Sequence, residues 1–236
     1  MQEADLIAKP DPKGVKDPAA ESPFEQTYRG LMRAIYEGSL IPGQRLIAPD
    51  LMRRFGVGRG TIREALHRLA SSGVVSIIPN RGAQVRQLTR REVDEVLDIV
   101  EVLFGLAARG AAGSIHEADN RDQLRKLHAA LHPAYTLDAF NQFLEAREAY
   151  YRGIVALSGN HELQRQFPSA QVHIMRVQLR NFGRAADSVD PNDYLFLTNA
   201  ILSGDVEKAE AAGRHHVEFT KRRVETLPDR AFLTDR

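Results

Sequence analysis

The spacing of apolar residues along the chain predicts two structurally different parts. From Tyr28 onward apolar residues recur near the helical period, and two further helices are predicted over 48–55 and 60–72. The short β-branched run 74–78, a Pro-Asn-Arg-Gly turn and the run 83–87 then predict a β-hairpin. Three helices followed by a hairpin, within about 65 residues, is the element order of a winged helix-turn-helix.

Beyond residue 89 the apolar positions keep the helical period throughout. Thr89 and Glu92 have the spacing of a capping box, which predicts the start of a helix whose apolar stripe runs from Val93 to Ala111. Short breaks rich in Gly, Pro, Asn or Asp separate the later helices, predicted over 119–131, 137–158, 161–183, 191–203 and 205–226. The predicted fold class is therefore mainly α: an N-terminal winged helix-turn-helix followed by an all-α antiparallel helical bundle.

These patterns divide the chain into four segments. Residues 1–23 are rich in proline and charge and poor in large apolar side chains, so we expect a disordered lead-in. The winged helix is predicted to cover 24–88 and the helical domain 89–228, with a tail over 229–236. The winged helix and the helical domain are therefore expected to be two separately folded domains.

Charge is distributed unevenly between these segments. The whole chain has a net charge of +1, but residues 24–88 carry ten Arg, no Lys and four acidic residues, a net charge of +6. The rest of the chain is mildly acidic. A compact basic segment beside an acidic body indicates an anionic partner for the winged helix alone.

Several classes of protein are disfavoured by what the sequence lacks. There is no cysteine, which excludes disulfides, thiolate zinc sites and iron–sulfur clusters. No apolar run is long enough for a membrane helix or a secretory signal, so we expect a cytoplasmic protein with no membrane partner. No P-loop, GxGxxG, HExxH or nucleophile–base pattern appears, and an enzyme built on the bundle is disfavoured.

The start of the third predicted helix carries residues suited to DNA. Arg59 and Arg63 are four residues apart and share one face, with Thr61 between them in the first turn. Arg can bind guanine with two parallel hydrogen bonds, and Thr hydroxyls suit phosphate oxygens. The predicted wing tip holds Arg81 and Gly82, and the Arg could enter the minor groove. An isolated Arg pair is usually a solvated face, but its place on a recognition helix predicts binding to double-stranded operator DNA.

Two stretches of this segment resemble the GntR family of transcription regulators. Residues 35–46 fit the pattern IxxGxLxPGxxL, and residues 55–66 read FGVGRGTIREAL, followed by a wing-like RGAxV at 81–85. The resemblance implies that the two arginines and the threonine of the third helix contact operator DNA, with glycine at the wing tip. Gly58 stands where the family usually has Ser or Thr, and Pro49 where some members have another DNA-contacting Arg. These two departures bear on which operator sequence is recognised, and not on DNA binding itself.

The helical domain is similar to the FadR-type effector domain, the FCD domain, over about 90–225. The similar stretches read GLAAR, ALSGN and AILSGD, with a His further along. Most such domains hold a divalent metal with one Asp and three His inside the bundle. Carried over, those four positions fall on Arg147, Tyr151, Tyr194 and His216. A cationic Arg repels a divalent ion and Tyr is a poor ligand, so we predict no metal and no other cofactor.

The same four positions form our candidate effector site. Arg147 lies in the middle of an otherwise apolar helical stripe, and an inward Arg is costly unless an anion meets it. A small organic acid or similar effector fits, since Arg binds carboxylates with two hydrogen bonds. The alternative is an internal pair with Glu101 or Glu145 and tyrosines that only pack. His173 and Arg176 are weaker candidates on a neighbouring helix.

Together these features predict a transcription regulator that senses a small organic effector. Two-fold operator DNA requires two reading heads, so a homodimer is expected. The resemblance implies a repressor released by its effector. Two alternatives stay open: an effector-independent DNA-binding dimer, whose bundle interior would be fully packed, and a regulator that still binds a divalent metal.

Overall fold

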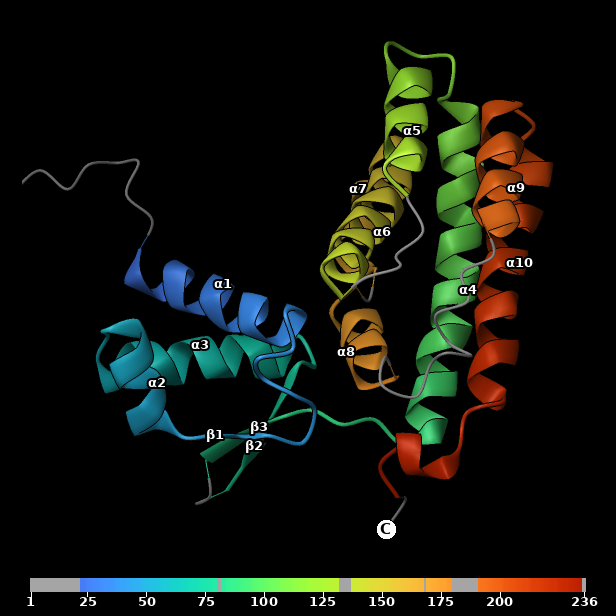
Figure 1. Cartoon of the computed structure of the whole chain (residues 1–236). Helices are drawn as coiled ribbons and strands as arrows, with labels where there is room; N and C mark the ends of the chain where they lie inside the picture. Colours follow the sequence, from blue (N-terminus) through green and yellow to red (C-terminus); the bar gives the residue numbers. More distant parts are fainter. Residues whose placement is uncertain (1–21, 80–81, 132–136, 168, 180–190, 235–236) are drawn as a thin grey trace, which may run out of the picture.

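The computed structural model of the chain (Figure 1) contains a small mixed domain and a larger helical domain joined by a short linker. The structure describes residues 22–79, 82–131, 137–167, 169–179 and 191–234. The elements of the first domain are α1 (Pro23–Tyr36), β1 (Arg45–Leu46), α2 (Ala48–Phe55), α3 (Arg59–Ser71), β2 (Val75–Ile78) and β3 (Gly82–Val85). Those of the second are α4 (Arg90–Gly113), α5 (Asn120–Ala129), α6 (Leu137–Leu157), α7 (His161–Gln166), α8 (Ser169–Leu179), α9 (Pro191–Leu202), α10 (Val206–Glu225) and the 3₁₀ turn Asp229–Ala231.

The first domain is a winged helix-turn-helix, which confirms the predicted fold class. Helix α2 ends at Gly56, whose φ of +64° turns the chain toward α3. The sheet has the order β1-β3-β2 and all its pairs are antiparallel, with Val75 of β2 opposite Val85 of β3. Strand β1 was not predicted, because two residues are too few to show an alternating pattern.

Helix α1 begins earlier than the periodicity predicts. We expected the helix from Tyr28, but it starts at Pro23, and the Ser22 side chain accepts a hydrogen bond from the Glu25 N–H at 3.1 Å. Serine before the helix and proline in its first turn are strong start signals that an apolar period does not register. The rest of the predicted disordered lead-in, residues 1–21, lies outside the described residues.

The second domain is a bundle in which α4 and α10 lie side by side along their length (Figure 1). The predicted capping box is present: the Glu92 N–H donates to the Thr89 hydroxyl at 3.1 Å, and the Thr89 N–H donates to the Glu92 carboxylate at 2.8 Å. After Val85 the described residues contain no strand, as the periodicity predicts. None of the described helices is long and apolar enough to cross a membrane.

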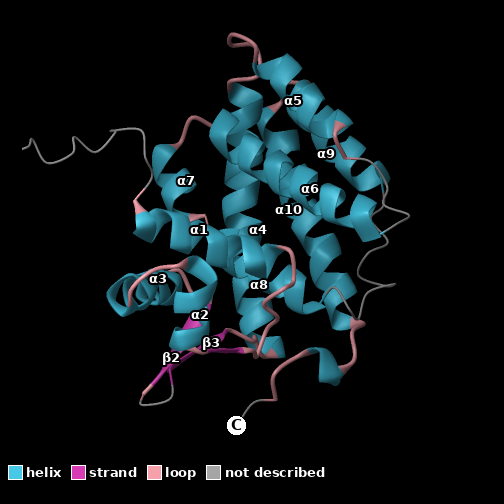
Figure 2. Cartoon of the chain, turned by 60° about the vertical axis from the view of Figure 1, so that its left-hand side comes forward, coloured by secondary structure: helices cyan, strands magenta, loops and turns pink. Residues whose placement is uncertain are grey.

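The predicted single helix over 161–183 is wrong, because the chain breaks at Phe167. Helix α7 ends there with φ −62° and ψ 124°, and α8 starts at Ser169. The sequence explains the break, since Pro168 disfavours a helical conformation in the residue before it. The break lets α8 leave the direction of α7 and lie between the winged helix and the bundle (Figures 1 and 2), where it contacts both α1 and α4.

A buried glutamine on α8 ties the two domains together. The Gln178 amide accepts a hydrogen bond from the Leu88 N–H at 2.7 Å and donates to the carbonyls of Leu88 and Ala231 at 2.8 and 2.9 Å. The Leu233 N–H also donates to the Leu88 carbonyl at 2.9 Å. The interdomain linker, the C-terminal turn and α8 therefore meet in one hydrogen-bonded junction.

Candidate DNA-binding face and candidate effector site

Helix α3 has one apolar face and one basic face. Its buried residues, which pack into the core of the winged helix, are Ile62, Ala65, Leu66 and Leu69. Arg59 and Arg63 lie on the opposite, exposed face, where they line a shallow hollow with Gly60, Glu64 and His67. The core packing of α3 thus fixes the direction in which its two candidate DNA-binding arginines project.

The first turn of α3 has free backbone donors. Gly58 precedes the helix in an extended conformation and supplies no side-chain cap to these N–H groups. Unpaired N–H groups at a helix start suit phosphate oxygens. Thr61 lies half-buried in the same turn. This arrangement suits a phosphate contact at the edge of the recognition face.

The wing begins its return strand with a glycine. Gly82 is exposed, and its φ of +88° is a conformation that favours glycine. It pairs with Ile78 across the hairpin. Arg81, the residue that we predicted to enter the minor groove, lies outside the described residues.

Three of the four predicted effector residues form one buried polar cluster. Helix α6 supplies Tyr151, α9 supplies Tyr194 and α10 supplies His216. The Tyr151 hydroxyl is hydrogen-bonded to the Tyr194 hydroxyl at 3.0 Å and to His216 Nε2 at 2.7 Å. On the other side of the ring, His216 Nδ1 lies 2.6 Å from the Asp193 carboxylate.

Two arginines approach the same phenol. The fourth predicted residue, Arg147, donates from Nε to the Tyr151 hydroxyl at 3.4 Å. Arg176 of α8 places its guanidinium carbon 4.8 Å from the centre of the Tyr151 ring. A guanidinium over an aromatic face is an attractive arrangement. Tyr151 is thus the centre of a site to which four helices contribute.

A second carboxylate besides Asp193, that of Glu148, lies beside Arg176. It pairs with Arg176 at 3.4 Å and with Arg152 at 3.6 Å. Glu101, one of the two internal partners considered for Arg147, belongs to a different network with Lys221 and Arg214. The other, Glu145, is exposed.

The charges around Tyr151 change its acidity. Burial alone would raise the pKa of Tyr151, but Arg147, His216 and Arg176 together lower it to about 6. Burial opposes the protonation of His216, but Tyr151 and Asp193 overcome it and raise the pKa of His216. Burial raises the pKa of Tyr194 well above its usual value. The cluster therefore favours a Tyr151 phenolate that accepts hydrogen bonds from its neighbours.

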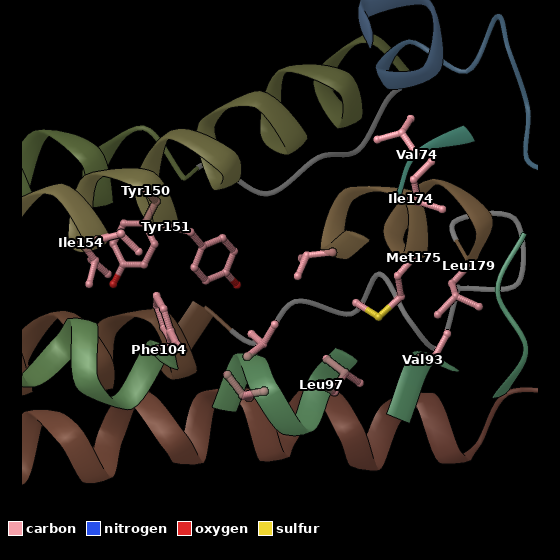
Figure 3. Close-up of a cluster of buried hydrophobic side chains, with 14 of the residues drawn as sticks. Val74, Val93, Leu97, Phe104, Tyr150, Tyr151, Ile154, Ile174, Met175 and Leu179 are labelled. Carbon is pink, nitrogen blue, oxygen red and sulfur yellow. The ribbon is translucent and has the colours of Figure 1, made fainter. Parts of the chain in front are cut away.

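A cavity of about 270 Å³ adjoins this cluster. Figure 3 shows Tyr151 pointing into the space between α6 and α4, with Met175 and Leu179 of α8 facing Leu97 from the other side. Arg147, Tyr151 and His216 line the cavity, and Tyr194 supports Tyr151 from behind without lining it. The helical domain thus offers a ligand-sized space whose lining combines apolar side chains with arginines, two of which face Tyr151.

The donor set does not fit the divalent metal that most FCD domains hold. His216 Nε2 is hydrogen-bonded to the Tyr151 hydroxyl, and His216 Nδ1 lies against the Asp193 carboxylate, so both ring nitrogens already have partners. A guanidinium stands at the position of a carboxylate ligand. Within the described residues, no group of three or more His, Cys, Asp or Glu side chains could hold a metal ion.

The sequence missed part of this site. Glu148 and Asp193 were not singled out, and Arg176 was only a weak candidate. Asp193 directly precedes Tyr194, so a search for acids beside the candidate positions could have found it. The contact of Arg176 with Tyr151 could not be predicted, because the sequence pattern predicts one helix over 161–183 and gives no separate direction for α8. The side chain of His173 lies outside the described residues.

Comparisons with protein families agree with both halves of the chain. Residues 23–85 match the model described as bacterial regulatory proteins, gntR family, and residues 95–219 match the FCD domain. These are domains of regulators rather than of enzymes.

Individual relatives give the same picture. A probable D-xylose utilization operon transcriptional repressor of Paenarthrobacter nicotinovorans is 25% identical over 191 residues, which cover 79% of this chain and 82% of the relative. The transcriptional repressor GlaR of Escherichia coli K12 is 27% identical over 203 residues, which cover 80% and 90%.

Solved structures share the fold. E. coli McbR/YncC aligns with a TM-score of 0.68 at 21% identity, covering 87% of this chain and 98% of that one. A GntR regulator from Rhodococcus sp. RHA1 also aligns with a TM-score of 0.68, at 20% identity, covering 86% and 97%.

Proposed function

Because the chain belongs to the GntR family of bacterial regulatory proteins and carries an FCD domain, we propose that it is a transcription repressor controlled by a small organic anion. Regulators of this family bind operator DNA and usually form dimers. The operator contacts are assigned to Arg59, Thr61 and Arg63 on α3 and to Arg81 and Gly82 in the wing. We take 24–88 as the DNA-binding unit and 89–228 as the effector-binding unit.

The effector proposal is carried by one observation: two arginines converge on a buried phenol at the end of a cavity. Arg147 and Arg176 come from different helices, and both face Tyr151. Guanidinium groups match the geometry of a carboxylate, so an organic acid is the ligand class that this end of the cavity favours. An effector-independent dimer predicts a packed interior, and the cavity of about 270 Å³ favours a sensor.

The experiment joins binding to DNA release. Operator DNA is first selected from genomic fragments with the purified protein, and a panel of organic acids is then added to the complex. We expect at least one acid to raise the melting temperature of the protein and to release the DNA. Arg147→Gln should abolish both effects, while the charge-matched Arg125→Gln on α5, which is exposed, should retain them. Equal responses from both variants would remove Arg147 from the site.

The absence of the family's metal remains a prediction. The purified protein should contain no stoichiometric zinc, manganese or nickel by elemental analysis, and chelator treatment should leave its melting temperature unchanged. Stoichiometric metal that chelation removes, with a loss of stability, would contradict the prediction and restore the metal-binding alternative.

For the homodimer, α4 offers a candidate contact surface. Ile99, Val102 and Leu106 are exposed by 57%, 51% and 43%, and their spacing places them on one face of α4. Because operator symmetry requires two heads, we assign this face to a second copy of the chain. Val102→Asp should then shift the protein from dimer to monomer in light scattering. Val102→Ile should remain dimeric.

A further inference from the structure

We propose that the effector is a monocarboxylic acid with an apolar body, whose carboxylate is held jointly by Arg147 of α6 and Arg176 of α8. This inference rests on the proposed function and narrows the ligand class of the same site. It also assigns to Arg176 a binding role that neither the family resemblance nor the comparisons provide.

The charge at the polar end of the cavity fits a single carboxylate. Two guanidinium groups face Tyr151 there, and one carboxylate, Glu148, lies beside them. The Arg176 and Glu148 side chains are only 15% and 11% exposed, so solvent screens them weakly. Arg152, which also lines the cavity, pairs with the same Glu148 at 3.6 Å. A dicarboxylate or tricarboxylate would bring a second charge toward Glu148.

Away from the two arginines that face Tyr151, the lining of the cavity is mostly apolar. Most of its aliphatic and aromatic lining comes from α4, α8 and α10, and α6 and the α7–α8 break add to it: Leu97, Val100, Phe104, Val155, Ala156, Phe167, Val172, Met175, Leu179, Val217 and Val224. In Figure 3 Met175 and Leu179 face Leu97 and Val93 across this space. Gln164, Thr220 and Arg223 also line the cavity, but apolar side chains make up most of the lining. Most hydroxyl groups of a sugar acid would therefore lose their hydrogen bonds to water without replacement.

The size of the cavity sets the size of the apolar body. A volume of about 270 Å³ corresponds to roughly nine water molecules at about 30 Å³ each. An acid of roughly ten non-hydrogen atoms, such as octanoate or phenylacetate, occupies a comparable space. Acetate would reach the arginines but leave the apolar walls uncovered.

The position of Arg176 gives the ligand a direct contact with the interdomain junction. Arg176 and Met175 line the cavity, and Gln178 on the same helix holds the Leu88 backbone and the C-terminal turn. A ligand bound to Arg176 therefore touches the helix that is hydrogen-bonded to the linker. No intermediate element is needed between the bound acid and the segment that carries the DNA-binding domain.

The test uses the full-length protein and acids matched in concentration and ionic strength. Calorimetric titrations compare butyrate, hexanoate, octanoate and phenylacetate with gluconate, succinate and citrate. We expect the apolar monoacids to bind, with affinity rising about threefold to fourfold for each added methylene until the cavity is full. Octanamide, which has the same body and no charge, should bind at least tenfold more weakly than octanoate.

Matched variants test the two anchors. Arg176→Gln and Arg147→Gln should each weaken octanoate binding at least tenfold, while Arg165→Gln on α7, an exposed arginine, should change it less than twofold. Arg176→Lys retains the charge but loses the paired hydrogen bonds, so it should recover only part of the affinity. Circular dichroism melts establish that each variant is folded. If Arg176→Gln does not fold, Arg176→Lys alone decides, and affinity equal to wild type would overturn the role of Arg176.

The outcomes separate this inference from the function that it rests on. Binding of gluconate or citrate without the apolar acids would overturn the apolar monoacid and retain an anion-sensing regulator. Octanamide binding as tightly as octanoate would overturn the carboxylate contact. If none of the acids binds the protein and none changes its binding to operator DNA, both the anionic effector and the apolar monocarboxylic acid would be overturned.

Discussion

The DNA-binding face and the effector cavity are built in opposite ways. The recognition residues lie within one helical turn of each other on the exposed side of α3, and the core residues of the same helix orient them. The cavity collects residues from α4, α6, α7, α8 and α10, and these helices span more than a hundred residues of the sequence. The first surface depends on a local motif, and the second on how the whole bundle packs.

The comparison predicts that the DNA contacts can be removed without disturbing the cavity. Arg59→Ala with Arg63→Ala should weaken operator binding by about 3 kcal/mol, roughly a hundredfold, because each Arg that contacts a base contributes about 1–3 kcal/mol. Filter binding or fluorescence anisotropy at fixed salt measures the loss, and effector binding by calorimetry should stay unchanged. Operator affinity equal to wild type would remove the recognition-helix assignment.

The junction between the two regions should be sensitive to one amide. Gln178→Leu leaves the buried Leu88 N–H and Ala231 carbonyl without the partner they have in the structure. Unsatisfied buried groups cost about 1–3 kcal/mol each, so the free energy of unfolding should fall by about 2–4 kcal/mol. Urea unfolding gives the value, and Gln123→Leu at an exposed position of α5 is the matched control. Equal stability of the two variants would contradict a structural role for the junction.

The cavity, unlike the DNA face, should bind its ligand with a pH dependence. The groups that surround the Tyr151 phenol are Arg147, Arg176, Tyr194 and His216, the last with Asp193 behind it. With its pKa lowered to about 6, Tyr151 is ionised at neutral pH and balances the arginines. An arriving carboxylate disfavours that phenolate, so ligand binding should take up a proton.

The sign follows directly. Below about pH 6 Tyr151 is already protonated and the affinity should be constant, whereas above it the Kd should rise by up to tenfold per pH unit. Calorimetry in two buffers of different ionisation enthalpy measures the proton uptake, and tyrosinate absorbance follows the phenol. Tyr151→Phe should bind with little pH dependence. An equally steep profile in that variant would assign the proton to another group.

The smallest predicted effect concerns the cap of α3. Gly58 has the extended conformation of a capping residue, and a Cβ built there meets nothing within 4 Å. Gly58→Ser should stabilise the protein by a few tenths of a kcal/mol and add a hydroxyl for phosphate, strengthening operator binding by about twofold to tenfold. Gly58→Ala lacks the hydroxyl and should show neither gain. Identical operator affinity in the two variants would place Gly58 away from the DNA backbone.

The sequence predicted the DNA-binding domain better than the effector cavity. The helix-turn-helix and the capping box at Thr89 depend on residues a few positions apart, and both are present in the structure. Tyr151, Tyr194 and His216 were grouped through the family resemblance, and the structure brings them together. The place of Arg176 depends on the break at Phe167 and on packing between distant helices, which a periodicity of apolar residues cannot express.

That break also links two properties of the regulator. Arg176 and Gln178 lie on one short rigid helix, and inserting a single residue ahead of them would rotate both by about 100° and advance them by about 1.5 Å. A change in α8 that adapts Arg176 to a new effector therefore also shifts Gln178, whose hydrogen bonds hold the linker to the DNA-binding domain. Effector selectivity and the coupling of effector binding to the DNA-binding domain must therefore change together in this protein. Operator recognition by α3 can change without affecting either.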